Sequence, residues 1–124
     1  EAKHEDQIFK GGRFHMKEVK RVVQINGVPV NTEKELIENA NVSLAVYAGS
    51  TGFCGGGRKK GGRTYVSIEN EGATDMIVTL KTGKDGNGSG FEIAASGDAE
   101  LMSLAYAFAT VSATLLDSIS EEEE

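Results

Sequence analysis

Gly49-Ser-Thr-Gly-Phe-Cys-Gly-Gly-Gly-Arg-Lys-Lys-Gly-Gly-Arg-Thr64 is the stretch around which the rest of the chain is arranged. It holds seven of the 16 glycines and four of the 13 basic residues, on a chain whose formal net charge is -6. Glycine backbone can turn its N–H groups toward an anion, and basic side chains supply the compensating charge. The stretch therefore predicts a phosphate-binding loop, and a disordered linker kept soluble by its charges is the alternative.

Alternating apolar and polar residues on both sides of this loop are typical of β-strands. The runs with this period are Val42–Ala48, Thr64–Glu69, Thr74–Lys81 and Phe91–Ala95. Nearer the N-terminus, strands are expected at Arg13–Ile25 and Val28–Val30, joined by Asn26-Gly27, a dipeptide typical of two-residue hairpins. Pro29 would place the second of these strands at the edge of a sheet, because proline cannot donate a ladder hydrogen bond.

Two helices are expected. Thr32-Glu-Lys-Glu35 matches a capping box and predicts a short helix that ends near Ala40. Asp98 is a suitable N-cap for a long C-terminal helix. Its inward face is predicted from apolar residues at spacings of three and four, namely Leu101, Leu104, Phe108, Val111, Leu115 and Ile119. A flank of small residues would admit either the chain's own sheet or a helix of a neighbouring subunit: Ala105, Ala107, Ala109, Ser112 and Ala113.

These elements predict an α+β fold in which an antiparallel sheet of about five strands packs against the long helix, with one short additional helix. The 124 residues are expected to form a single domain, 1–124, in which 1–12 and 120–124 are flexible. A single cysteine, Cys54, excludes an internal disulfide framework and favours a reducing, cytoplasmic location. The acidic balance argues against nucleic acids and anionic membranes as partners, and no uninterrupted apolar run predicts a membrane span.

No catalytic residue, metal site or cofactor is predicted. His4 and His15 lack partners at the spacings typical of metal ligands. Cys54 lies in the basic loop, but a nucleophilic cysteine usually needs a histidine base, which only the fold could bring to it. A small enzyme that acts on a phosphorylated substrate through Cys54 or a carboxylate remains a minor alternative.

A nucleotide is the ligand that the loop suits best. The loop lacks the Gly-Lys-Ser/Thr of a P-loop, and it joins two strands, unlike a dinucleotide fingerprint. Arg58, Arg63 and Lys84 are predicted to bind phosphates, and Phe53 or Phe91 to stack on a base. Asn87 is predicted to recognise a polar group of the ligand, and Lys59 is a further predicted ligand-binding residue. Lys84 and Asn87 lie in a second glycine loop, 82–90, which could close over the same site. For Phe91, a place in the core is the competing interpretation.

Residues 49–116 also carry a family resemblance. They contain Gly61-Gly-Arg-Thr-Tyr65 at the end of the glycine loop, Thr74-Asp75 at the start of a strand, Phe91-Glu-Ile93, and Gly97-Asp-Ala-Glu-Leu101 before the long helix. This pattern resembles phage-encoded anti-Thoeris sponge proteins. The resemblance implies a homo-oligomer that sequesters cyclic ADP-ribose-type signals or cyclic oligonucleotides, without cleaving them, in pockets between subunits. A protein-interaction module or inhibitor of a macromolecular partner is the rival hypothesis.

Overall fold

The computed structural model describes residues 7–10, 13–53, 61–84 and 88–123, with side chains described from residue 21 to residue 119 of these ranges. Seven strands and one helix lie within them, in the order β1 (Gln7–Lys10), β2 (Arg13–Ile25), β3 (Val28–Asn39), β4 (Val42–Ser50), β5 (Thr64–Asn70), β6 (Met76–Thr82), β7 (Gly88–Ala95) and α3 (Asp98–Glu123). The predicted α+β class is confirmed, with a long C-terminal helix and antiparallel strands.

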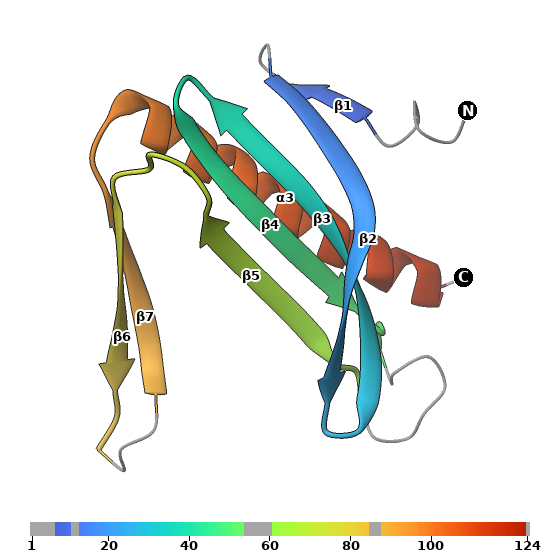
Figure 1. The fold of residues 1–124 in the computed structure, drawn as a ribbon. Helices are drawn as coiled ribbons and strands as arrows, with labels where there is room; N and C mark the ends of the chain where they lie inside the picture. The colour runs from blue at the N-terminus through green and yellow to red at the C-terminus, as the bar shows by residue number, and fades with distance from the viewer. Residues whose placement is uncertain (1–6, 11–12, 54–60, 85–87, 124) are drawn as a thin grey trace.

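The strands form two separate sheets. Strands β1 to β5 pair in sequence order, and β6 pairs only with β7 (Figure 1). The β2–β5 part is strongly curled, and α3 lies behind it along β3 and β4. The hairpin of β6 and β7 stands apart from the sheet beyond β5. The prediction that a single sheet contains all the strands is therefore wrong, because β6 and β7 form a sheet of their own. Strand β1 was missed by sequence analysis.

The expected hairpin at Asn26-Gly27 is confirmed. Both residues have positive φ angles, 49° and 80°, as a tight turn between right-twisted strands requires. The prediction that Pro29 marks an edge strand is wrong, because β3 pairs with β2 on one side and β4 on the other. Proline is tolerated there because the β3–β4 ladder begins only at Glu33, so at Pro29 the strand pairs with β2 alone.

The predicted short helix from Thr32 to Ala40 is also wrong, since these residues belong to β3 and the turn after it. The Thr32 hydroxyl does not cap a helix but donates a hydrogen bond to the Arg21 carbonyl oxygen on β2, at 2.8 Å. Ladders with β2 and β4 satisfy the backbone on both sides of this segment. Tertiary pairing therefore outweighs the local capping preference.

A tight approach between β3 and β4 accompanies the curl of the sheet. A Cβ atom at Gly49 would collide with the carbonyl oxygen of Asn31 and crowd the Cα atom of Thr32. The buried face of β3 also changes along the strand. The even-numbered residues Val28, Val30 and Thr32 are buried in its first half, and the odd-numbered residues Glu35, Ile37 and Asn39 in its second half. The curled sheet therefore covers side chains on both of its faces.

The core between the sheet and α3 is built from Ile37, Leu44, Val46 and Ala107. The predicted inward face of the helix is wrong at two of its largest members, because Leu101 is 70% exposed and Phe108 is 49% exposed. Leu104 and Val111 do pack against the core, as predicted. The most deeply buried side chains of the helix are small or polar: Glu100, Ser103, Ala107, Thr110 and Thr114. Small side chains let the helix approach the sheet closely, and Leu101 and Phe108 face outward.

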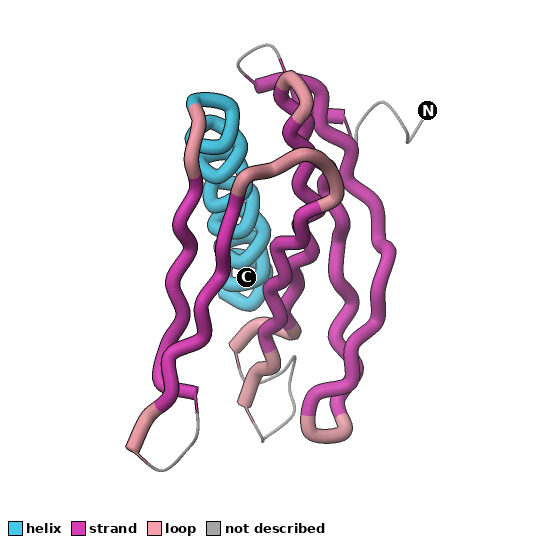
Figure 2. The backbone as a smooth tube through the Cα atoms, turned by 60° about the vertical axis from the view of Figure 1, so that its left-hand side comes forward, coloured by secondary structure: helices cyan, strands magenta, loops and turns pink. Residues whose placement is uncertain are grey.

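The β6–β7 hairpin is attached to the rest of the molecule at its root. Met76 packs against the core, and the Asp75 N–H donates to Glu100 Oε2 at 3.0 Å. The Ser96 N–H donates to the Asp75 carbonyl oxygen at 3.1 Å, which closes the open end of the hairpin. Figure 2 shows the two strands running from this root to a tip at the far end.

Candidate functional site

A depression of about 370 Å³ lies at the base of the glycine-rich loop. It is formed where β4 ends and β5 begins, against the last turns of α3. Its lining residues are Ser50, Gly52, Phe53, Gly62, Thr64, Leu115 and Ile119. The lining thus combines one exposed aromatic ring, two aliphatic side chains from the helix, and hydroxyl and glycine positions from the loop base.

Hydrogen bonds hold the two ends of the loop together. The Thr51 N–H donates to the Arg63 carbonyl oxygen at 3.0 Å, and the Arg63 N–H donates to Thr51 Oγ1 at 2.9 Å. The hydroxyls of Ser50 and Thr64 lie 3.0 Å apart and share a hydrogen bond. The loop therefore starts from a fixed base, and residues 54–60 lie outside the described residues.

Glycine is required at Gly62, in the wall of the depression. A Cβ atom there would collide with the Gly52 carbonyl oxygen. Gly52 itself has a φ angle of 83°, in the left-handed region that favours glycine. Part of the glycine content is thus explained by backbone geometry at the loop base.

Arg63 connects the loop base to the turn between β2 and β3. Its Nε donates to the Ile25 carbonyl oxygen at 3.2 Å, and its Nη1 donates to the carbonyl oxygens of Gly61 and Gly62 at 3.0 and 3.4 Å. These contacts give Arg63 a structural role beside the depression. Its predicted role in phosphate binding stays a prediction.

The other predicted ligand residues are divided between two regions. Phe53 is exposed at the depression, whereas Lys84 lies near the tip of the β6–β7 hairpin and Phe91 on β7. The core interpretation of Phe91 is wrong, because the residue is 65% exposed. The loop ends of β4 and β6 lie toward the same end of the molecule (Figure 1). Arg58, Lys59 and Asn87 lie outside the described residues.

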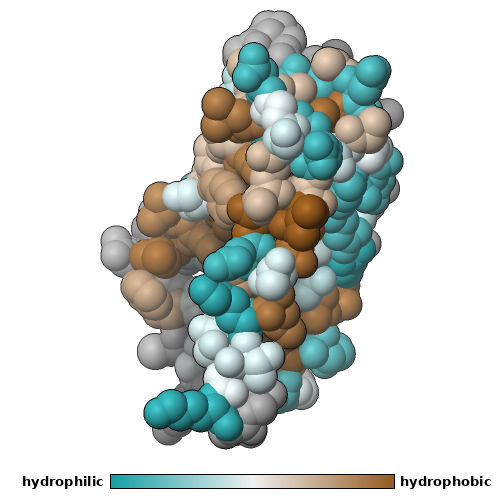
Figure 3. Space-filling model, turned by 90° about the vertical axis from the view of Figure 1, so that its left-hand side faces the viewer, coloured by the Kyte–Doolittle hydropathy of each residue, from teal (hydrophilic) through white to brown (hydrophobic). Residues whose placement is uncertain are grey.

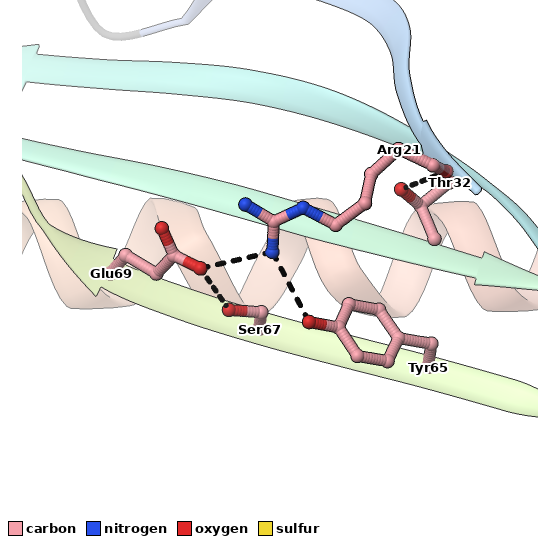
Figure 4. A network of polar contacts seen from close by, with 5 residues as sticks. All are labelled: Arg21, Thr32, Tyr65, Ser67 and Glu69. Carbon is pink, nitrogen blue, oxygen red and sulfur yellow. Dashed lines mark hydrogen bonds and ion pairs between the residues drawn. The ribbon is translucent and has the colours of Figure 1, made fainter. Parts of the chain in front are cut away.

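A polar cluster that sequence analysis missed occupies the sheet face opposite α3 (Figure 4). Arg21 Nη1 donates to Glu69 Oε2 at 3.0 Å and to Tyr65 Oη at 3.2 Å. The Arg21 guanidinium also lies over the Tyr47 ring, with Cζ 3.6 Å from the ring centroid. Ser67 Oγ donates to the same Glu69 oxygen at 2.9 Å. This cluster joins β2 to β5 across the curled sheet.

The electrostatics of the cluster are those of a stable ion pair. Hydrogen bonds from Arg21 and then from Ser67 lower the pKa of the Glu69 carboxyl below its usual range. The same contact with Glu69, followed by that with Tyr65, raises the pKa of Arg21. Because both charged groups are satisfied by each other, the cluster is suited to holding the curl rather than to proton transfer.

A second depression, of about 180 Å³, lies next to the first and shares Ser50 with it. Its lining includes the carboxylates Glu33 and Asp117, together with Asn31, Thr114 and Ser118. Two carboxylates would repel a phosphate, so this depression is the poorer candidate for a nucleotide. Among the residues whose placement is described, no group of three or more histidines, cysteines and acidic residues could hold a metal ion.

Comparison of the chain with protein-family models, with curated proteins and with solved structures gave no match.

Proposed function

We propose that this protein binds a small nucleotide in the depression at the base of the glycine-rich loop and sequesters it without chemical change. The observation that supports the proposal is the position of the depression: about 370 Å³ of open volume lies between Phe53 and Gly62, the two sides of the loop base. That volume is within the range of small-molecule sites, about 300–1,000 Å³.

Different residues of the site would bind the base, the ribose and the phosphates of the nucleotide. Phe53 offers a ring on which a base can stack, next to the aliphatic side chains of Leu115 and Ile119. The hydroxyls of Ser50 and Thr64 can bond to a ribose. Of the cations that sequence analysis assigned to phosphates, Arg58 follows Phe53 by five residues and Arg63 by ten.

Binding without turnover is supported by the chemistry of the lining. The described lining residues include no carboxylate, histidine or thiol that could act as a general base or nucleophile. The family resemblance extends the proposal to cyclic ADP-ribose-type signals or cyclic oligonucleotides, bound in the host cytoplasm by a phage-encoded protein to block antiphage defence.

Isothermal titration calorimetry against cyclic ADP-ribose isomers, cyclic dinucleotides and linear ADP-ribose tests this function. We expect saturable binding of at least one cyclic nucleotide, which is recovered intact after heat denaturation. Base stacking on an aromatic side chain is worth about 1–3 kcal/mol, so Phe53→Ala should weaken binding by about 5- to 150-fold. Val22→Ala, at an exposed position on β2, is the matched control and should leave the affinity unchanged.

The proposal fails if none of these nucleotides binds, or if Phe53→Ala and Val22→Ala bind with the same affinity. A role as a protein-interaction module is the second candidate. The observation that favours it is an extended apolar surface, which lies on the helix and the hairpin.

A further inference from the structure

The outward face of α3 lacks the charged residues that normally cover a surface helix. No charged residue occurs from Leu101 to Leu116. The exposed residues in this span are Leu101, Met102, Ala105, Phe108, Ala109, Ser112, Ala113 and Leu116. A helix that faces water on one side usually has charged and polar residues there. This face therefore has the composition of a helix that is covered on both sides.

The β6–β7 hairpin adds a second apolar surface. In its register Leu80 lies opposite Phe91, and Val78 lies opposite Ile93. Met76, on the same face, packs against the core, and exposure then rises toward the tip, reaching 72% at Leu80. A two-stranded hairpin alone is only marginally stable in water, so the apolar face of this one needs a covering partner.

The two surfaces are large enough for a stable interface. In the space-filling view from the side of the hairpin, apolar side chains gather across the middle of the molecule (Figure 3). The exposed large members of this apolar surface are Val78, Leu80, Phe91, Leu101, Met102, Phe108 and Leu116. At roughly 100 Å² each they expose about 700 Å², which exceeds the usual largest patch of a monomer and approaches the ~800 Å² per partner of a standard interface.

We propose that a second copy of this chain covers the apolar surface, with the two α3 helices packed antiparallel about a two-fold axis. The pattern on the helix is self-complementary under this symmetry. With the axis between residues 108 and 109, Phe108 of each copy meets the small Ala109 of the other, and Leu101 meets Leu116. Large side chains thus enter the space left by small ones.

Charge favours the antiparallel orientation over a parallel one. The chain ends in four consecutive glutamates, at residues 121–124. Parallel helices would bring these two acidic ends together. Antiparallel helices place each of them beside the first turn of the partner helix, where Asp98 is acidic but the end of the helix dipole is positive. Like charges that lie within a Debye length repel each other, so the parallel dimer is disfavoured.

A lipid bilayer is the main competing partner for so apolar a helix. By length and composition the segment Asp98–Ile119 could cross a membrane, with a mean hydropathy of 1.4. To do so it would have to leave the sheet and expose Ile37, Leu44 and Val46, each less than 2% exposed in the fold. A second copy covers the apolar surface and leaves this core intact.

Sedimentation velocity across protein concentrations of about 1–100 μM tests the proposal, and no ligand is needed. We expect a species of twice the 13.1 kDa chain mass. Phe108→Glu places a charge near the axis, and it should raise the dimer dissociation constant about 30-fold or more, as expected for a central aromatic contact. Val22→Glu is the control, because Val22 is 58% exposed but lies on β2, away from the apolar surface. Circular dichroism checks that both variants keep the native secondary structure.

Cysteine cross-linking tests the two-fold arrangement itself. In a Cys54→Ser background, Ala109→Cys should give a disulfide-linked dimer on mild oxidation, because the two positions approach each other across the axis. Glu71→Cys, exposed in the turn after β5, should not form such a dimer.

Three outcomes would each overturn the proposal: a monomer at 100 μM, a dimer that Phe108→Glu leaves intact, or flotation of the protein with phosphatidylcholine vesicles. Since these readouts need no nucleotide, they can fail while the nucleotide-binding proposal holds, and the converse is also true.

Discussion

Thr110→Val should stabilise the protein, because it removes a hydroxyl that the fold buries without a partner. Thr110 is 4% exposed and lies on the face of α3 that packs against the sheet. Its Oγ1 atom finds no hydrogen-bond partner among the described residues, and neither does Oγ of Ser103 two turns earlier. Such groups lose their bonds to water on folding and gain nothing in return.

The size of the effect follows from the cost of that burial. An unsatisfied buried hydroxyl costs about 1–3 kcal/mol, and valine keeps the β-branched shape and nearly the same helix propensity as threonine. Allowing for imperfect repacking of the new methyl group, we expect a gain of about 1 kcal/mol in the free energy of unfolding. For a domain of this size that gain corresponds to a rise in Tm of about 3–6 °C.

Urea denaturation followed by far-UV circular dichroism measures this change. The titration should be repeated at several protein concentrations, so that subunit dissociation is separated from unfolding. Thr79→Val is the matched control: it makes the same change at an exposed position of β6 and should change stability by less than about 0.5 kcal/mol. A loss of 1 kcal/mol or more in Thr110→Val would refute the reasoning, since it would mean that the Thr110 hydroxyl has a partner and that α3 packs differently.

Two further predictions concern the curled sheet. Gly49→Ala should destabilise the fold by about 2 kcal/mol or more, because the added Cβ would collide with the Asn31 carbonyl oxygen. Urea titration measures this loss. Gly27→Ala is the comparison, because space is open there but φ is positive, so it reports the cost of backbone strain without crowding. Because the pKa of Glu69 is lowered in the fold, the stability that its pairing with Arg21 provides should be complete above the ordinary glutamate range and be lost as the pH falls below about 4. Glu69→Gln should therefore show a smaller drop in Tm between pH 7 and pH 3, and an equal drop would contradict this assignment.

The local signals in the sequence were sufficient for most strands and for the long helix. Asn26-Gly27 predicted its hairpin correctly because the turn depends on the φ angles of those two residues alone. Alternation predicted β5 and β6 because the two faces of each strand differ in polarity. β4 was predicted as well, although it is buried along almost its whole length. Asp98 marked the start of α3 for a similar reason, since a helix cap is a local arrangement.

The failures occurred where distant residues decide the outcome. Thr32 has the spacing of a helix cap, but its hydroxyl bonds to β2, and only the assembled ladders reveal this. On α3 the spacing of large apolar residues indicated one inward face, but only part of it packs inward: Leu104 and Val111 contact the core, whereas Leu101 and Phe108 are exposed. Spacing alone identifies which residues share a helix face, but the contacts with the assembled sheet decide which part of that face is buried.

The sequence allowed part of the candidate site to be predicted, as it did for the fold. Sequence reasoning located the glycine-rich loop and placed Phe53 in it, because composition and charge are local properties. It could not find the depression, whose far wall comes from Leu115 and Ile119 on α3. It also missed the Arg21 cluster, whose partners Tyr65 and Glu69 lie 44 and 48 residues away in the chain.

Native mass spectrometry of the purified protein, with and without added cyclic ADP-ribose isomers and cyclic dinucleotides, tests the central claim of nucleotide sequestration most directly. The account predicts that the protein gains the mass of a nucleotide, and that heating releases this nucleotide with its mass and chromatographic retention unchanged. A protein that gains no mass with any of these nucleotides, or that returns a cleaved product, would contradict it.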